Sequence, residues 1–224
     1  MFPIPLRDTQ PSYSRPLITS LIIAVNVAVF LHQISLDGYS QNYFMLHYGL
    51  VARHPRPLAL LTSMFLHGGW LHIIGNMWFL WIFGKNVEDA LGHAKYLIFY
   101  LLCGVAAGVT QVLFTAGSSA PMVGASGAIA GVMGAYLVKF PHSRIVSLVV
   151  IFFFFTTIEI PAVLMLGIWF LLQFFNGFGS IGYSHLSQGG TAWFAHVGGF
   201  IAGMILVAVM GTRPIYTRRR DLTW

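Results

Sequence analysis

The chain has 224 residues, of which 57% are hydrophobic and only 8% are charged, whereas about a quarter of a typical soluble domain is charged. So much apolar surface excludes an ordinary water-soluble enzyme and indicates a protein that is embedded in lipid. The net charge of +6 would suit a nucleic-acid-binding protein, but the positions of the basic residues along the chain argue against that class.

Six apolar segments follow one another along the chain, and a helix that crosses the hydrocarbon core needs about 20 residues. The second and the fourth segments are short by this measure. The first segment resembles a signal peptide, but no small-residue cleavage site follows it, so we expect it to remain in the protein. The segments are Leu17–His32, Trp70–Phe83, Tyr96–Thr115, Ser126–Val138, Ile160–Gly179 and Trp193–Gly211.

These segments predict an all-α fold, a polytopic membrane bundle of six transmembrane helices. We expect residues 1–16 to form a cytoplasmic N-terminal segment, residues 17–211 to form the membrane domain, and residues 212–224 to form a basic cytoplasmic tail. The single cysteine, Cys103, leaves no internal disulfide to form.

The basic residues test this count of segments. If the N-terminus lies inside, ten of the twelve Lys and Arg residues fall on the inner side, which is the asymmetry expected of a correct topology. Only Arg53 and Arg56 fall outside. We therefore interpret Arg218–Arg220 as an anchor beside lipid headgroups, expect no nucleic-acid partner, and expect both termini to be cytoplasmic in the cell (inner) membrane. The inner basic residues are Arg7, Arg15, Lys85, Lys95, Lys139, Arg144, Arg213, Arg218, Arg219 and Arg220.

The connections between the segments differ in character. Gln33–Pro57 is long and rich in tyrosine, which is typical of a chain at a membrane interface. Ala116–Ala125 and Ser180–Ala192 are short, uncharged outer loops. Arg144–Glu159 is very apolar but too short to cross the membrane twice, so we expect an inner-face linker that lies along the membrane.

Four polar residues within the segments are predicted to share one depth. Polar side chains inside a membrane are costly and usually face a protein interior or a water-filled cavity. At 1.5 Å per residue from the nearest inner basic residue, Ser126 and His72 lie roughly 20 Å above the inner face, Asn76 about 14 Å and His196 about 25 Å. In a core about 30 Å thick, all four fall in the outer part, where water can enter from outside.

Glycines beside Ser126 and His196 predict that their two helices approach closely. After Ser126, glycines occupy positions 127, 131 and 134. After His196, glycines at positions 199 and 203 lie on the same helix face as the histidine. Small residues four apart let helix backbones come together in lipid. Most of these glycines pack helices whatever the function, but a serine and a histidine beside such stripes are candidates for direct contact.

A serine hydroxyl becomes an effective nucleophile when a neighbouring base takes its proton, and histidine is the natural base near neutral pH. The six acidic residues lie in or near loops and chain ends, so a Ser-His-Asp triad is not expected. The candidate catalytic pair is Ser126 as nucleophile and His196 as general base. The alternatives are that Ser126 only caps a helix and that His196 is an interfacial histidine.

The remaining candidates surround this pair. His72 and Asn76 are one turn apart on one face and, with Gly124 and the Ser126 backbone N–H, are candidate oxyanion or substrate-binding groups. His67 and His72 are five residues apart, a poor spacing for binding one metal from a helix face, so we expect no metal and no cofactor. We expect His67 to tie the first loop to the second apolar segment.

Four motifs, in order along the chain, resemble those of the rhomboid intramembrane proteases. Gly-Ala-Ser-Gly at residues 124–127 is similar to the family's GxSG motif, and residues 195–203 are similar to its AHxxGxxxG motif. Residues 67–76 carry a histidine and then the HxxxN pattern, and residues 84–89 resemble the end of the family's second span. GxSG alone is a weak signal, since soluble hydrolases use a similar elbow, but four motifs in order are specific. The resemblance covers about residues 57–211.

The resemblance implies that Ser126 is the nucleophile, His196 the general base, and His72, Asn76 and the Ser126 N–H the oxyanion donors. It also implies transmembrane-protein substrates, cut near the outer end of a helix that unwinds locally, often after a small residue. The fifth span and its outer loop would form a lateral gate and cap.

Two departures from the family pattern concern support and loop anchoring. Some members carry a tyrosine four residues after the nucleophile, beneath the catalytic histidine; here the residue is Ala130, so another residue must support His196. Other members carry a Trp-Arg pair in the first loop, and none occurs between Gln33 and Pro57.

Two other functions remain open. A non-catalytic member of the same fold would bind and move membrane proteins, as derlins do, but the presence of both Ser126 and His196 argues against it. A small transporter would use the histidine-lined cavity as its path, but the sequence lacks the paired repeats that indicate one. We expect transmembrane-protein substrates and membrane lipids as partners, and the sequence leaves the oligomeric state open.

Overall fold

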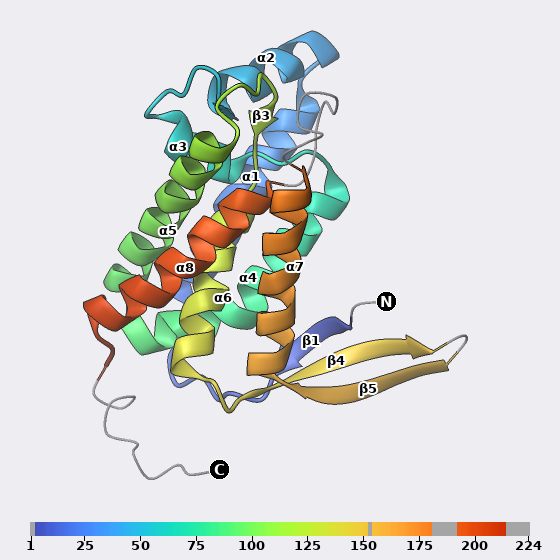
Figure 1. Cartoon of the computed structure of the whole chain (residues 1–224), viewed down its shortest axis with the longest axis vertical. Coiled ribbons are helices and arrows are strands. Elements are labelled where there is room, and N and C mark those ends of the chain that lie inside the picture. Colours follow the sequence, from blue (N-terminus) through green and yellow to red (C-terminus); the bar gives the residue numbers. More distant parts are fainter. Residues whose placement is uncertain (1–2, 152–153, 181–191, 214–224) are drawn as a thin grey trace.

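Each of the six predicted apolar segments forms a helix in the computed structural model, which describes residues 3–151, 154–180 and 192–213. These helices pack side by side in one bundle (Figure 1). Their bounds are α1 Leu17–Ser35, α4 Trp70–Leu91, α5 His93–Phe114, α6 Ser126–Lys139, α7 Ala162–Ser180 and α8 Trp193–Met210. Between α1 and α4 lie the shorter helices α2 Gly38–Tyr48 and α3 Ala59–Thr62 and the 3₁₀ turn η1 Ser63–Phe65.

Four of the described helices, α1, α5, α7 and α8, are long and apolar enough to cross a membrane by length and composition. α6 is apolar but has 14 residues. α4 has 22 residues but carries Lys85, Glu88 and Asp89 near its end. Large apolar side chains are exposed on the outward faces of the helices, among them Leu71 and Val209, which are 87% and 78% exposed. Extended apolar surface of this kind marks contact with a membrane.

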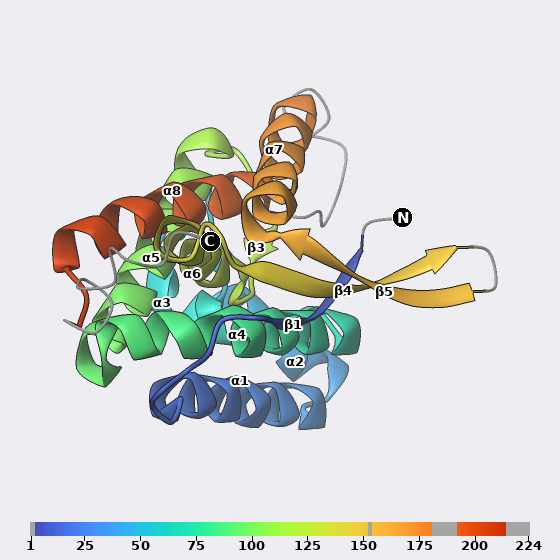
Figure 2. The same ribbon diagram turned by 90° about the horizontal axis from the view of Figure 1, so that it is seen from below.

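The all-α prediction is too narrow, because two small sheets accompany the helices. β4 (Arg144–Ile151) and β5 (Phe154–Pro161) form an antiparallel hairpin in place of the predicted linker along the membrane. β1 (Ile4–Asp8) pairs with β4, and the hairpin projects away from the bundle (Figures 1 and 2). A second sheet pairs β2 (Leu50–Val51) with β3 (Pro121–Met122). The hairpin sequence is rich in β-branched and aromatic residues, which favour strands as much as they favour lipid.

Helix α6 lies at the centre of the bundle. It packs against α4, α5, α7 and α8, and every residue from Gly127 to Tyr136 is buried. α7 stands at the edge of the bundle, on the side away from α1 (Figure 2). The bundle therefore surrounds the helix that begins at Ser126.

The end of α4 fastens the N-terminal segment to the bundle. Both oxygens of Glu88 accept hydrogen bonds, one from the backbone N–H of Ile18 and the other from that of Thr19, each at 2.8 Å. Glu88 thus caps α1, whose own first turn has no acidic residue. Asp89 accepts a hydrogen bond from the Ser14 hydroxyl at 2.5 Å.

Asp8 of β1 makes a second connection to the same end of the bundle. Its carboxylate is buried, forms an ion pair with Lys85 at 3.0 Å, and accepts a hydrogen bond from the Tyr136 hydroxyl at 2.8 Å. The amide of Asn86 also donates to it. The buried charge is therefore satisfied by three partners from α4 and α6.

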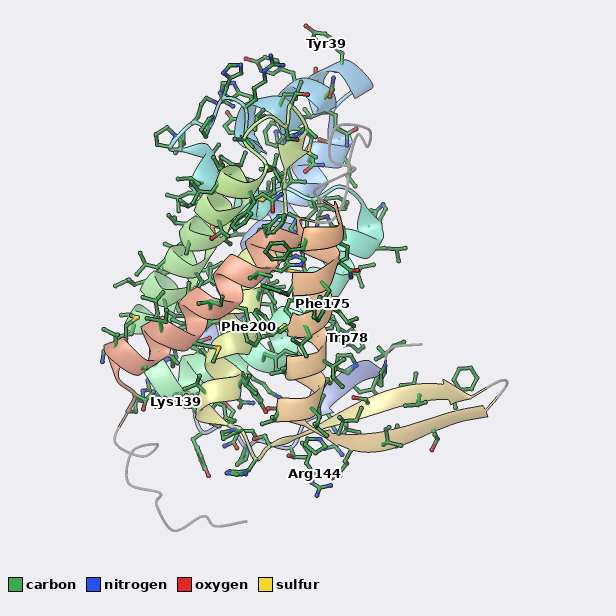
Figure 3. The ribbon with its side chains drawn as sticks, in the orientation of Figure 1. Tyr39, Trp78, Lys139, Arg144, Phe175 and Phe200 are labelled. Carbon is green, nitrogen blue, oxygen red and sulfur yellow. The ribbon has the colours of Figure 1, made fainter. Side chains whose placement is uncertain are left out.

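The two ends of the bundle differ in the residues they carry. Lys139 and Arg144, which the sequence assigns to the inner side, lie at one end, and Tyr39 of the first predicted outer loop lies at the other (Figure 3). The Arg218–Arg220 run, and residues 181–191 of the predicted outer loop Ser180–Ala192, fall outside the described residues.

Candidate active site

Ser126 and His196 are in hydrogen-bonding contact. The Ser126 Oγ lies 2.8 Å from Nε2 of His196, although 70 residues separate them in the chain. Ser126 is the first residue of α6, and His196 lies in the first turn of α8. His196 is 8% exposed, and Ser126 is partly exposed. The pair therefore sits where these two helices begin, with the nucleophile candidate on the more open side.

Contact between the backbones of α6 and α8 permits this short distance. A Cβ added at Gly199 would overlap the carbonyl oxygen of Gly127, and one added at Gly203 would overlap that of Gly131. A side chain at any of these contacts would hold the two helices apart. The close approach is the one that the glycine spacing predicts.

The start of α8 is also held by α5. Gln111 Oε1 accepts a hydrogen bond from the backbone N–H of Ala195 at 3.0 Å, which satisfies one of the N–H groups that a helix start leaves free. This bond fixes the backbone immediately before His196.

The residues that support His196 come from α7. The His196 Nδ1 lies 2.6 Å from Oε1 of Gln173, and the ring of Trp169 lies against the imidazole with a centroid distance of 5.7 Å. Because Ala130 stands where some family members carry a supporting tyrosine, the sequence did not indicate which residue supports His196. We did not predict a role for Gln173 from the sequence, although it is the only amide side chain in the apolar run from Ala162 to Phe175. A lone polar side chain in such a run is a usable signal, since lipid would not solvate it.

His72 and Asn76 converge on the turn before Ser126. A Cβ at Gly124 would lie 2.7 Å from Nε2 of His72 and 3.5 Å from Nδ2 of Asn76. The Gly68 backbone N–H donates to the His72 Nδ1 at 3.3 Å, so a neutral ring carries its proton on Nε2, the atom that faces Gly124. Both side chains thus direct donors to one point.

The side-chain amide of Asn76 lacks a hydrogen-bond acceptor among the described residues. Its side chain is 8% exposed, and its Nδ2 donor has no hydrogen-bond partner within the described residues. A buried donor without an acceptor costs about 1–3 kcal/mol. An oxygen that carries negative charge near Gly124 would supply the missing acceptor.

His67 links the end of α1 to the chain before α4. The Gln33 side chain donates to the His67 carbonyl at 2.7 Å and accepts from the His67 N–H at 3.2 Å. The predicted tie between the first loop and the second span is therefore made by the His67 backbone, while its buried ring packs edge-on against His72 with a centroid distance of 5.1 Å. In the part of the chain that the structure describes, no three His, Cys, Asp or Glu side chains group as metal ligands.

This fold and these contacts define a membrane protein with several crossing helices and a serine–histidine pair at the starts of α6 and α8. The model of the Rhomboid domain matches residues 54–213 of the chain. The chain belongs to the rhomboid family, most of whose members are serine proteases, and it is a multi-pass membrane protein.

Several curated proteins are similar to this chain. It is 30% identical over 203 residues to rhomboid protease GluP of Bacillus subtilis, covering 88% of this chain and 35% of that protein. It is 28% identical over 210 residues to the chloroplastic rhomboid-like protein 11 of Arabidopsis thaliana, covering 90% and 68%. It is 32% identical over 139 residues to the mitochondrial presenilin-associated rhomboid-like protein of Homo sapiens, covering 60% and 36%. The chain thus spans about a third of the length of the bacterial and human relatives.

Proposed function

We propose that this chain is an intramembrane serine endopeptidase that cuts transmembrane helices of membrane-protein substrates by a Ser126–His196 dyad. The observation that carries the proposal is the 2.8 Å contact between the Ser126 Oγ and Nε2 of His196. Family membership and the similarity to rhomboid protease GluP support the same reaction class.

The geometry supports a two-stage acyl transfer. His196 Nε2 takes the hydroxyl proton as Ser126 Oγ attacks the carbonyl carbon of the scissile peptide. The resulting oxyanion is stabilised by His72 Nε2–H, Asn76 Nδ2–H and the Ser126 N–H. The C–N bond then breaks, His196 gives its proton to the leaving amine, and an acyl ester remains on Ser126. Water, deprotonated by His196, hydrolyses this ester and restores the serine.

The proposed topology follows from the distribution of charge. All six long helices lie across the cell (inner) membrane, and the apolar parts of α4 and α6 span only part of its thickness. Both termini lie in the cytoplasm. The dyad then lies toward the outer face, and lipids contact the exposed apolar faces of the helices. α7 would form the lateral gate through which a substrate helix reaches Ser126, and the loop after it, which the resemblance also assigns to the gate, lies outside the described residues.

The test is cleavage of a model transmembrane substrate by the purified full chain in detergent and in proteoliposomes. We expect Ser126→Ala and His196→Ala to abolish cleavage and labelling by a serine-directed fluorophosphonate, while Ser118→Ala, which removes a loop serine, leaves both unchanged. Equal cleavage by the Ser126→Ala variant would contradict the proposal. Substrate binding without cleavage by the wild type would favour a derlin-like binding function, and solute uptake into proteoliposomes would favour a transporter.

A further inference from the structure

The imidazole of His196 is held on both of its nitrogens, by residues from two different helices. Nε2 contacts Ser126 of α6 at 2.8 Å, and Nδ1 contacts Gln173 of α7 at 2.6 Å. Gln173 is 7% exposed, so it is withdrawn from lipid although α7 lies at the edge of the bundle (Figure 2). The inward-facing amide has His196 as its partner.

This arrangement selects one form of the ring. The Oε1 atom of an amide can only accept a hydrogen bond, so the proton between it and Nδ1 belongs to His196. A neutral imidazole that carries its proton on Nδ1 has a lone pair on Nε2. That lone pair is the acceptor the Ser126 hydroxyl needs. The opposite tautomer would place a proton between Nε2 and Oγ and leave Ser126 without a base.

The neighbourhood of Gln173 reinforces the role. Trp169 lies one turn before it on the same face of α7 and packs on the same imidazole. Residues of α7 outside this face, such as Leu172 and Phe175, are 46% and 66% exposed. α7 therefore meets the dyad through one face and presents an apolar face to the surroundings.

We propose that Gln173 is the positioning residue of this site: it holds His196 in the Nδ1–H tautomer, so that the dyad is competent only while α7 is packed against α8. The inference rests on the proposed function of Ser126 and His196. It assigns to α7 a direct bond to the general base, in addition to any role in admitting substrate.

The experiment compares wild type with three variants of α7. Gln173→Met removes the strong acceptor at similar length, Gln173→Glu keeps an acceptor and adds charge, and Leu172→Ala is the matched control on the exposed face. For each purified protein we would measure the melting temperature, kcat and KM for a transmembrane substrate, and the pH dependence of fluorophosphonate labelling. All variants retain His72 and every other titratable group of the wild type, so differences in the pH profiles report on position 173.

For Gln173→Met we expect kcat and the labelling rate to fall about 10- to 100-fold with little change in KM, because the ring loses its orienting bond and leaves a buried N–H unpaired. Gln173→Glu should recover labelling, with the acid limb of its pH profile moved to higher pH, since a carboxylate stabilises the protonated ring. Leu172→Ala should behave as wild type.

Labelling of Gln173→Met at the wild-type rate would overturn the inference, as would an unshifted acid limb in a folded Gln173→Glu protein. If the Met variant fails to fold, nitrogen-15 NMR of wild-type His196 decides: a protonated Nδ1 and an unprotonated Nε2 support the inference, and the reverse pattern overturns it. A wild type that neither labels nor cleaves contradicts the proposed function itself, which separates the two failures.

Discussion

Gly203 of α8 lies against the backbone of Gly131 in α6, so closely that a Cβ on Gly203 would overlap the Gly131 carbonyl oxygen. The obstacle is a main-chain atom, and a main-chain atom in a packed helix cannot move aside as the end of a side chain can. The two helices that carry Ser126 and His196 therefore have one spacing at which they fit together.

Gly203→Ala is expected to destabilise the bundle by about 2 kcal/mol or more, because overpacking against backbone forces the helices apart. Labelling of Ser126 should fall as well, since the dyad contact depends on the same spacing. The measurement is thermal unfolding in detergent together with fluorophosphonate labelling. Gly75→Ala is the control, because a Cβ at Gly75 of α4 meets no atom within 4 Å. Equal stability of the two variants would show that this helix contact is not the limiting one.

Gly124→Ala should remove activity with a smaller effect on folding. The new Cβ would lie against His72 and Asn76, and residue 124 has φ +123°, a backbone conformation that residues with a side chain rarely adopt. We expect the cleavage rate to fall about 10²- to 10³-fold, as for the loss of an oxyanion donor. Gly117→Ala, in an open part of the loop, is the control. Wild-type cleavage by the Gly124→Ala variant would place the oxyanion elsewhere.

Tyr136→Phe should cost about 1–2 kcal/mol of unfolding free energy, because the Asp8 carboxylate loses a hydrogen bond from a buried hydroxyl. Tyr100 offers a matched comparison, since its hydroxyl is also buried but has no hydrogen-bond partner among the described residues. Tyr100→Phe should therefore change stability little. Chemical or thermal unfolding of both variants measures the difference, and equal losses would mean that the Asp8 bond contributes nothing.

Glu88→Gln should lower the unfolding free energy by about 2–3 kcal/mol. The substitution removes the charge that caps α1 and puts an amide NH₂ in place of one carboxylate oxygen, either the one that accepts from Ile18 and His93 or the one that accepts from Thr19. Glu159→Gln, at an exposed position of β5, is the control and should be neutral. Proteolysis within residues 9–16 would report whether the N-terminal segment has come loose, and unchanged protection would argue against the capping role.

Hydropathy was sufficient to locate the six long helices, because each contains a mainly apolar run that ends near glycine, proline or charge. The contact of Ser126 with His196 could be anticipated for a different reason. Glycines repeated at helical spacing beside both residues leave few ways to pack the two helices other than against each other.

Two features could not be predicted in this way. The apolar composition of Arg144–Glu159 is equally compatible with β-strands and with a segment at the membrane surface. The strand that pairs with it, β1, lies about 140 residues earlier in the chain. The position of Gln173 on α7 was visible, but which face of α7 turns toward His196 depends on the rotation of that helix. Packing, not local sequence, sets that rotation.

The connections at the end of α4 have a consequence for the order in which the protein is made. Ser14, Ile18 and Thr19 find their partners on Glu88 and Asp89, 69 to 75 residues later in the chain, and the bond from Tyr136 to Asp8 spans 128 residues. A ribosome releases the N-terminal segment long before these partners exist. The N-terminal segment can therefore form these bonds only after α4 and α6 have been made and inserted. Its packing against the end of α4 is thus a late step, which follows assembly of the first half of the bundle.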